Sequence, residues 1–115
     1  MKKILIVEDS AVDGKNLQRI LLDAGCAVSI AVSGLDALEK VKLDKPDLIL
    51  MDVNMPDLDG FATARKLHQS PETKVIPVVF VTSKDQKADR VFAQMLGAKG
   101  YVTKPYAAEQ ILSLL

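Results

Sequence analysis

The segment LILMDVNMPDLDG, residues 48–60, is the most informative part of this sequence. Its four apolar residues run directly into the carboxylate of Asp52 and then into a turn rich in Pro, Asp and Gly. A short apolar run that stops at such a turn is typical of a buried strand. Asp52 is therefore expected at the rim of a sheet. In open parallel sheets, ligands bind at the rim formed by the carboxyl ends of the strands.

Other apolar runs end on polar residues in the same way: residues 4–7 on Glu8 and Asp9, residues 78–81 on Thr82, and residues 100–103 on Lys104. If these strands are neighbours, three carboxylates, a hydroxyl and an amine meet at one edge of the sheet. That set of groups points to phosphoryl chemistry around a metal ion.

The alternation of segments predicts the fold class. Strands are expected near residues 3–7, 27–32, 48–52, 78–82 and 100–103, with helices ending near residues 24, 43, 69, 96 and 115. Near-continuous apolar strands separated by amphipathic helices imply a parallel sheet covered on both faces. We therefore predict an α/β, flavodoxin-like, doubly wound fold with a five-stranded parallel sheet, strand order 2-1-3-4-5, and five helices.

Two helices carry more detailed predictions. In the helix that Ser33 opens, the inward residues are predicted to be Leu35, Leu38 and Val41. A second helix is predicted to start at Ser83, capped by Ser83 and Gln86. Its expected apolar face is Ala88, Val91, Phe92, Met95 and Leu96.

Length and composition exclude some classes of function. Residues 1–115 are long enough for one ordinary domain, and their 49% hydrophobic and 26% charged residues are normal for a globular protein. Fifteen basic and fifteen acidic residues cancel, so we expect no direct nucleic acid binding. Neither a signal peptide nor a stretch of about 20 apolar residues is present, which predicts a cytoplasmic protein without membrane insertion. Cys26, the only cysteine, is expected to be a small buried residue.

The rim residues suit phosphoryl transfer. Asp52 is the candidate nucleophile, because a carboxylate can attack phosphorus to give an aspartyl phosphate. Glu8 and Asp9 beside it would repel one another unless a cation lay between them, and carboxylate oxygens without His or Cys ligands favour Mg²⁺ over zinc or copper. Lys104 can bring its ammonium to one phosphoryl oxygen, and Thr82 can donate its hydroxyl to another.

Over nearly its whole length the chain resembles the receiver domain of two-component response regulators. The matching pieces are IVEDS (residues 6–10), LMDVNMPDLDG (50–60), VTS (81–83) and GAKGYVTKP (97–105). Residues 82–86 and the single-domain layout look most like the small regulators of type IV pilus twitching chemosensory systems, which act in chemotaxis-like signalling. In one departure, Glu8 stands where many members of the family have Asp.

The resemblance implies a role for each matching residue. Asp52 would accept a phosphoryl group from a histidine kinase or phosphotransfer protein. Glu8, Asp9 and Asp52 would hold Mg²⁺ together with the backbone carbonyl of Asn54. Thr82 and Lys104 would bind the phosphoryl group. Such a protein is a switch that catalyses only its own phosphorylation and dephosphorylation.

Three further roles are expected. Asn54 and Lys84 lie two residues beyond Asp52 and Thr82, where they can tune the lifetime of the phosphoryl group. Tyr101 stands at the position of the family's aromatic switch and is expected to rotate inward when Asp52 is phosphorylated. A downstream protein target would read the change on the fourth helix, fifth strand and fifth helix.

Other functions remain open at this point. An aspartate-dependent phosphatase places a second acid two residues after its nucleophile, where this chain has Asn54. A flavodoxin needs a phosphate loop after the first strand, where Glu8 and Asp9 would repel the phosphate of FMN. A pseudo-receiver, which binds partners without phosphorylation, would not need the acidic pair, Thr82 and Lys104. The chain can also be the receiver fragment of a longer multidomain regulator.

Overall fold

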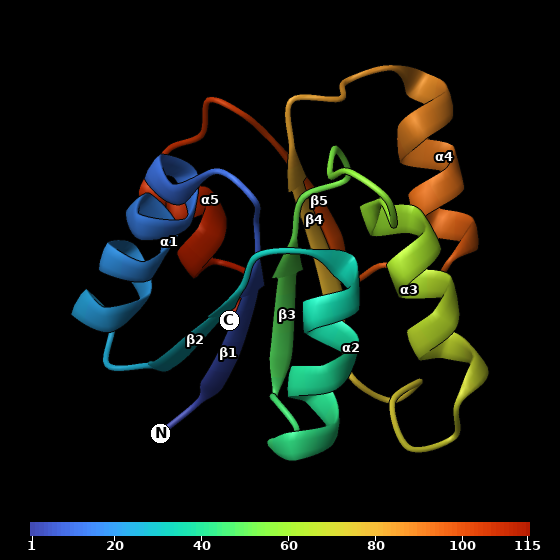
Figure 1. Cartoon of the computed structure of the whole chain (residues 1–115). Coiled ribbons are helices and arrows are strands. Elements are labelled where there is room, and N and C mark those ends of the chain that lie inside the picture. Colours follow the sequence, from blue (N-terminus) through green and yellow to red (C-terminus); the bar gives the residue numbers. More distant parts are fainter.

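The computed structural model describes residues 1–115, which form a five-stranded parallel sheet of order β2-β1-β3-β4-β5 with helices on both faces (Figure 1). The predicted fold class and strand order are confirmed. The elements are β1 (Lys3–Val7), α1 (Ala11–Asp23), β2 (Ala27–Ala31), α2 (Gly34–Leu43), β3 (Leu48–Met51), α3 (Gly60–Gln69), β4 (Val78–Thr82), α4 (Lys87–Met95), β5 (Gly100–Thr103) and α5 (Ala108–Leu112).

The sheet separates two hydrophobic cores. Helices α1 and α5 cover one face, and α2, α3 and α4 cover the other (Figure 1). Successive side chains of a strand point to opposite faces, so Leu5 and Ile49 enter one core while Ile4 and Leu48 enter the other. Full burial of each such side chain is worth about 1.5–3 kcal/mol. The central strands are therefore packed on both faces, and this packing fixes the positions of their carboxyl ends.

Helix ends follow local sequence signals. Ser33 Oγ accepts a hydrogen bond from the backbone N–H of Asp36 (3.0 Å), and Asp59 Oδ1 accepts one from the N–H of Ala62 (2.8 Å). Each satisfies a donor that the first helical turn leaves without a partner. Beyond α1, Gly25 adopts φ 85°, the left-handed conformation that ends many helices.

The predicted start of α4 is wrong. The helix begins at Lys87 rather than Ser83, and the side chain that caps it belongs to Asp89, whose Oδ2 accepts the N–H of Gln86 (3.2 Å). The residues between β4 and Gln86 form a loop over the rim instead. The last helix, predicted to reach residue 115, ends at Leu112.

Part of the predicted helix faces is also wrong. The following residues were expected to face inward and are exposed: Leu35, Ala88, Val91 and Met95. In their place Ala37 and Ala93 are fully buried. Apolar residues lie on more than one side of these helices, and the side that packs into the core carries Ala37 and Val41 in α2 and Ala93 in α4.

The prediction for Cys26 is confirmed. Cys26 is buried and unpaired. None of the helices combines the length and the apolar character needed to cross a membrane.

Candidate functional site at the carboxyl ends of the strands

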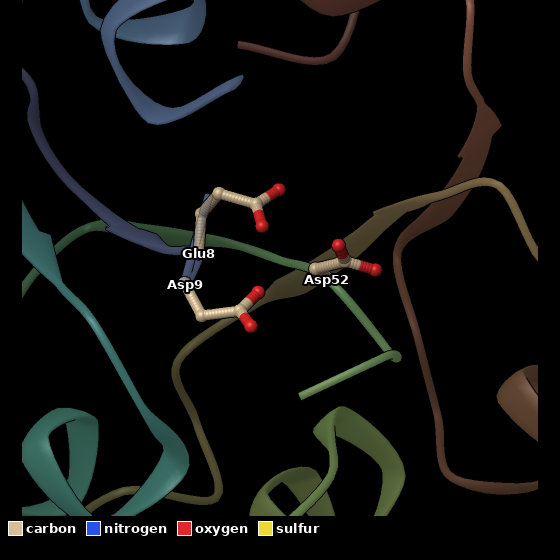
Figure 2. Close-up of side chains that lie close together, drawn as sticks. All are labelled: Glu8, Asp9 and Asp52. Atoms are coloured by element: carbon tan, nitrogen blue, oxygen red, sulfur yellow. The ribbon is translucent and has the colours of Figure 1, made fainter. Parts of the chain in front are cut away.

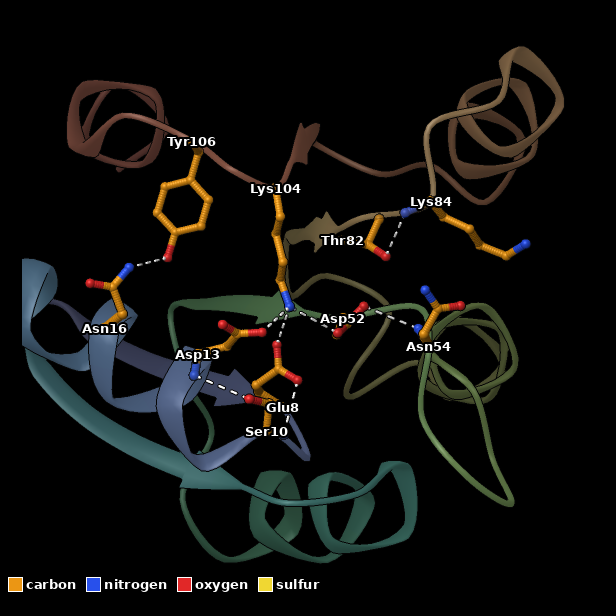
Figure 3. A network of polar contacts seen from close by, with 10 residues as sticks. All are labelled: Glu8, Ser10, Asp13, Asn16, Asp52, Asn54, Thr82, Lys84, Lys104 and Tyr106. Carbon is orange, nitrogen blue, oxygen red and sulfur yellow. Dashed lines mark hydrogen bonds and ion pairs between the residues drawn. The ribbon is translucent and has the colours of Figure 1, made fainter.

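The structure brings the predicted residues of four strands to one rim. Glu8 and Asp9 follow β1, Asp52 follows β3, Thr82 ends β4, and Lys104 follows β5. Figure 3 shows Glu8, Asp52, Thr82 and Lys104 together at this rim. The ladder of backbone hydrogen bonds continues just past the strands. The N–H of Asp52 donates to the carbonyl of Val7 (3.0 Å), and the N–H of Lys104 donates to that of Thr82 (2.9 Å). The side chains are thus fixed by the register of the sheet rather than by a mobile loop.

The turn after Asp52 is closed by a glycine contact. The N–H of Gly60 donates to the carbonyl of Val53 (2.9 Å), and a Cβ on Gly60 would lie 2.2 Å from the carbonyl oxygen of Asp52. Only glycine fits this approach of α3 to the end of β3. Asp57 takes φ 67° in the same turn, and Asp59 caps α3, so both have the structural roles that such turn residues commonly have.

Three carboxylates form a compact acidic cluster. One oxygen from each of Glu8, Asp9 and Asp52 lies within 4.8 Å of the others (Figure 2). Glu8 and Asp52 are buried, with 3% and 7% of their surface exposed, while Asp9 is exposed. Carboxylate oxygens without His or Cys ligands are the donor set that suits Mg²⁺. The residues present therefore fit a hard divalent cation.

A single ammonium group neutralises part of this charge. Lys104 Nζ lies 2.7 Å from Glu8 Oε1, 2.8 Å from Asp13 Oδ2 and 3.1 Å from Asp52 Oδ2 (Figure 3). An ammonium has three N–H donors, so all of them are used here. Lys104 is therefore an internal counter-ion for Glu8, Asp13 and Asp52.

This network shifts the pKa values of its members. Burial raises the pKa of Glu8 to about 7, although hydrogen bonds from Lys104 and from the N–H of Ser10 act against the rise. Burial lowers the pKa of Lys104, but hydrogen bonds to Asp13, Glu8 and Asp52 outweigh this effect and raise the pKa above its usual value. Lys104 consequently remains a cation at neutral pH.

Thr82 and Asn54 lie beside Asp52 (Figure 3). The backbone N–H of Asn54 donates to Asp52 Oδ1 (3.1 Å). Thr82 is fully buried, and its Oγ1 accepts the backbone N–H of Lys84 (3.2 Å). The Lys84 ammonium lies 3.5 Å from Asp89 Oδ1, so this side chain points toward α4 and away from Asp52 (Figure 3).

Tyr101 is joined to the same loop. Its hydroxyl donates to the carbonyl oxygen of Lys84 (2.6 Å), and its ring centroid lies 6.3 Å from that of Phe80. The guanidinium carbon of Arg90 lies 5.0 Å from the centre of the Tyr101 ring. Burial raises the pKa of the Tyr101 hydroxyl. The half-buried ring is therefore already in contact with the loop that follows Thr82.

Sequence reasoning missed three residues of this network: Asp13, Asn16 and Tyr106. Asp13 Oδ2 holds Lys104, and Asn16 Nδ2 donates to the Tyr106 hydroxyl (3.1 Å). Acidic residues are common in the first turn of any helix, so Asp13 carried no distinctive signal. Its role follows only from where α1 lies relative to the end of β5.

Residues 4–115 match the family model of the response regulator receiver domain. The chain belongs to this family. A curated relative, Protein PilH of Pseudomonas aeruginosa, is 41% identical over 100% of this chain and 95% of its own length. This agrees with the resemblance to regulators of twitching systems noted from the sequence. Receiver domains are phospho-accepting switches of two-component signalling rather than conventional enzymes.

Solved structures give the same result. The chemotaxis protein CheY4 of Vibrio cholerae superposes with a TM-score of 0.92 at 31% identity, covering 98% of this chain and 94% of that one. The receiver domain of the sensor histidine kinase PA1611 from Pseudomonas aeruginosa has a TM-score of 0.89 at 26% identity and covers 98% of this chain and 93% of its own. That structure contains a magnesium ion coordinated in the active site cleft.

Proposed function

We propose that this receiver domain accepts a phosphoryl group on Asp52 from a histidine kinase or phosphotransfer protein. The observation that carries the proposal is the convergence of Asp52, the acidic cluster, Thr82 and Lys104 at one rim. Modification of Asp52 then changes how the domain binds a downstream protein target.

In the transfer step an oxygen of Asp52 forms a bond to phosphorus, and the bond between phosphorus and the donor nitrogen breaks. The leaving histidine keeps the electron pair of that bond and takes up a proton. A Mg²⁺ ion held by Glu8, Asp9, Asp52 and the carbonyl oxygen of Asn54 would neutralise charge on the phosphoryl oxygens. The N–H of Asn54 holds Asp52 Oδ1 in place during the attack.

Lys104 and Thr82 supply donors to the new group. Lys104 Nζ is already 3.1 Å from Asp52 Oδ2, so a phosphoryl oxygen built on Asp52 falls within its reach. Thr82 Oγ1 accepts a hydrogen bond from the backbone N–H of Lys84, and its own hydroxyl hydrogen has no acceptor within the protein. That hydrogen can therefore go to a phosphoryl oxygen without breaking the bond to Lys84.

Two hydrogen bonds support a route from the site to the surface. Lys84 donates its N–H to Thr82 and accepts the Tyr101 hydroxyl on its carbonyl. A shift of Thr82 toward the phosphoryl group moves Lys84 and, through it, Tyr101. In this arrangement the Tyr101 hydroxyl is already bonded to the loop, so the ring would move with the loop rather than come in from outside. The face formed by α4, β5 and α5 would carry the change to the target.

The test of the acceptor is incubation with acetyl phosphate and Mg²⁺, followed by intact mass. We expect the mass of one phosphoryl group on the wild type, none on Asp52→Asn, and none in excess EDTA. Asp57→Asn is the matched control, because it removes a nearby carboxylate at a residue with φ 67°, a conformation that Asn tolerates. An adduct that persists in Asp52→Asn or forms equally well in EDTA would refute the assignment.

The test of the output compares NMR spectra of the free protein and the protein with beryllofluoride, an acyl-phosphate mimic. Shifts are expected at Lys84, at Tyr101 and along residues 87–94. Shifts confined to residues that touch Asp52 would contradict the proposed route.

A further inference from the structure

Two polar residues of α1 hold the segment that follows β5. Asp13 Oδ2 lies 2.8 Å from Lys104 Nζ, and Asn16 Nδ2 donates to the Tyr106 hydroxyl (3.1 Å) (Figure 3). Residues three apart lie on the same face of a helix, so this one face of α1 contacts both neighbours of Pro105. The helix therefore fixes the stretch of chain from which Lys104 reaches the site.

The three carboxylates that bind Lys104 differ in their other roles at the site. Asp52 is the proposed nucleophile, and Glu8 belongs to the acidic cluster. Asp13 belongs to neither, and its side chain is 44% exposed, against 2% for Glu8 and 8% for Asp52. It is the one partner of the ammonium that neither reacts nor joins the acidic cluster.

We propose that Asp13 is a positioning residue for phosphorylation, which holds the Lys104 ammonium over Asp52. The inference rests on the proposed function of Asp52. The lysine side chain is a flexible four-carbon stem with a point charge at its end, so its position depends on what binds the ammonium. When Glu8 and Asp52 are engaged by other groups, Asp13 alone keeps the ammonium where the phosphoryl oxygens arrive.

Removal of Asp13 has two effects of opposite sign. Loss of the Asp13 carboxylate slows phosphorylation, because the Lys104 ammonium is no longer held in the position where it can bind the phosphoryl oxygens. Loss of a negative charge near the site favours entry of an anionic donor and speeds phosphorylation. Two small donors separate these effects. Acetyl phosphate is a dianion at neutral pH, whereas phosphoramidate carries less negative charge.

The experiment measures phosphorylation rates by intact mass, at saturating Mg²⁺, for Asp13→Ala, Asp13→Asn and Asp13→Glu. We expect Asp13→Ala to be slower by about tenfold with phosphoramidate, as loss of one charged hydrogen bond implies, and slowed less with acetyl phosphate, whose larger negative charge gains more from loss of the carboxylate. Asp13→Glu, which restores a carboxylate, should recover part of the rate. Asp13→Asn keeps the size and one acceptor oxygen, and it carries the test if Ala disturbs folding.

The control is Asp44→Ala. Asp44 pairs with Lys3 Nζ at 2.9 Å near the amino end of β1, so this variant also removes an Asp–Lys pair and one negative charge. Its rate should equal that of the wild type. If neither the wild type nor Asp44→Ala is phosphorylated, the proposed function fails rather than this inference.

A second readout reports position directly. The ¹⁵Nζ–¹H signal of the Lys104 ammonium should be visible in the wild type, where all three donors are bonded, and lost to fast exchange in Asp13→Ala. The inference would be overturned if Asp13→Ala and Asp13→Asn reacted with phosphoramidate as fast as the wild type, whatever their rate with acetyl phosphate. The inference would also be overturned if phosphorylation of Asp13→Ala were slower while the NMR signal of the Lys104 ammonium stayed unchanged.

Discussion

Replacement of Lys104 by Met should destabilise the protein strongly in the absence of a divalent ion. The substitution keeps most of the apolar stem and removes the ammonium that lies 2.7 Å from Glu8 and 3.1 Å from Asp52. Both carboxylates are buried, so neither can recover its hydration. Two negative groups then face one another without a counter-ion.

The size of the effect follows from burial. Removing one partner of a buried ion pair costs about 3–5 kcal/mol, and the exposed partner Asp13 adds less than about 1 kcal/mol. Glu8, whose pKa burial already raises to about 7, can take up a proton and limit the loss. We therefore expect Lys104→Met to lower the free energy of unfolding by about 3 kcal/mol, the lower end of that range. For a domain of this size that corresponds to a fall in Tm of about 10 °C.

The assay is urea unfolding at neutral pH in EDTA and again with Mg²⁺. Lys3→Met is the matched control, because Lys3 makes an Asp pair of similar length, 2.9 Å, in which both side chains are more than half exposed. Its free energy of unfolding should change far less than that of Lys104→Met, because exposed ion pairs contribute little to stability. Mg²⁺ should restore much of the stability of Lys104→Met, since the cation replaces the missing charge. Equal losses for the two variants, or no response of Lys104→Met to Mg²⁺, would refute this reasoning.

Other predictions concern the turn, the lifetime and the pH response. Gly60→Ala should lower the free energy of unfolding by about 2–3 kcal/mol in urea titrations, because its Cβ would lie 2.2 Å from a backbone carbonyl oxygen. Lys84→Ala should shorten the lifetime of the phosphoryl group in a mass-detected decay, whereas Asp89→Ala, which releases the Lys84 ammonium from its 3.5 Å pair, should lengthen it; unchanged decays in both would contradict this role. The hydrogen bond from the N–H of Val32 lowers the pKa of Asp36 below 3.8, so its carboxylate stabilises the fold above that pH. Asp36→Asn should therefore be less stable at pH 7 by about 0.5–1 kcal/mol, with a gap that closes as the pH falls through the lowered pKa.

The sequence was sufficient to predict the sheet and the main residues at its rim. Strands β1, β3 and β4 are almost wholly apolar and end on polar residues, which indicates both a buried parallel sheet and the edge where its chemistry lies. Once the strand order was chosen, the meeting of Asp52 with Glu8 and Lys104 followed from topology alone. These features depend on local patterns and on rules that hold for all parallel sheets.

Two kinds of detail could not be predicted. The inward faces of α2 and α4 depend on how each helix is rotated about its own axis, and the side that faces the core carries Ala37 and Ala93 rather than the exposed Leu35 and Met95. The contact of Asp13 with Lys104 joins residues 91 positions apart and depends on the tilt of one helix over one strand end. Neither leaves a periodic signal in the sequence.

Under the proposed function, the main chain and the side chain of Lys84 affect different properties of the switch: the route of the signal and the lifetime of the phosphoryl group. Both of its links in the proposed route, the N–H to Thr82 and the carbonyl to Tyr101, are made by main-chain atoms. Any residue except proline can make them, so the route from the site to the surface tolerates substitution here. Under the proposed function, the Lys84 side chain would set how long the phosphoryl group survives. Substitution at this one position would then change the duration of the signal and leave its route to the surface unchanged.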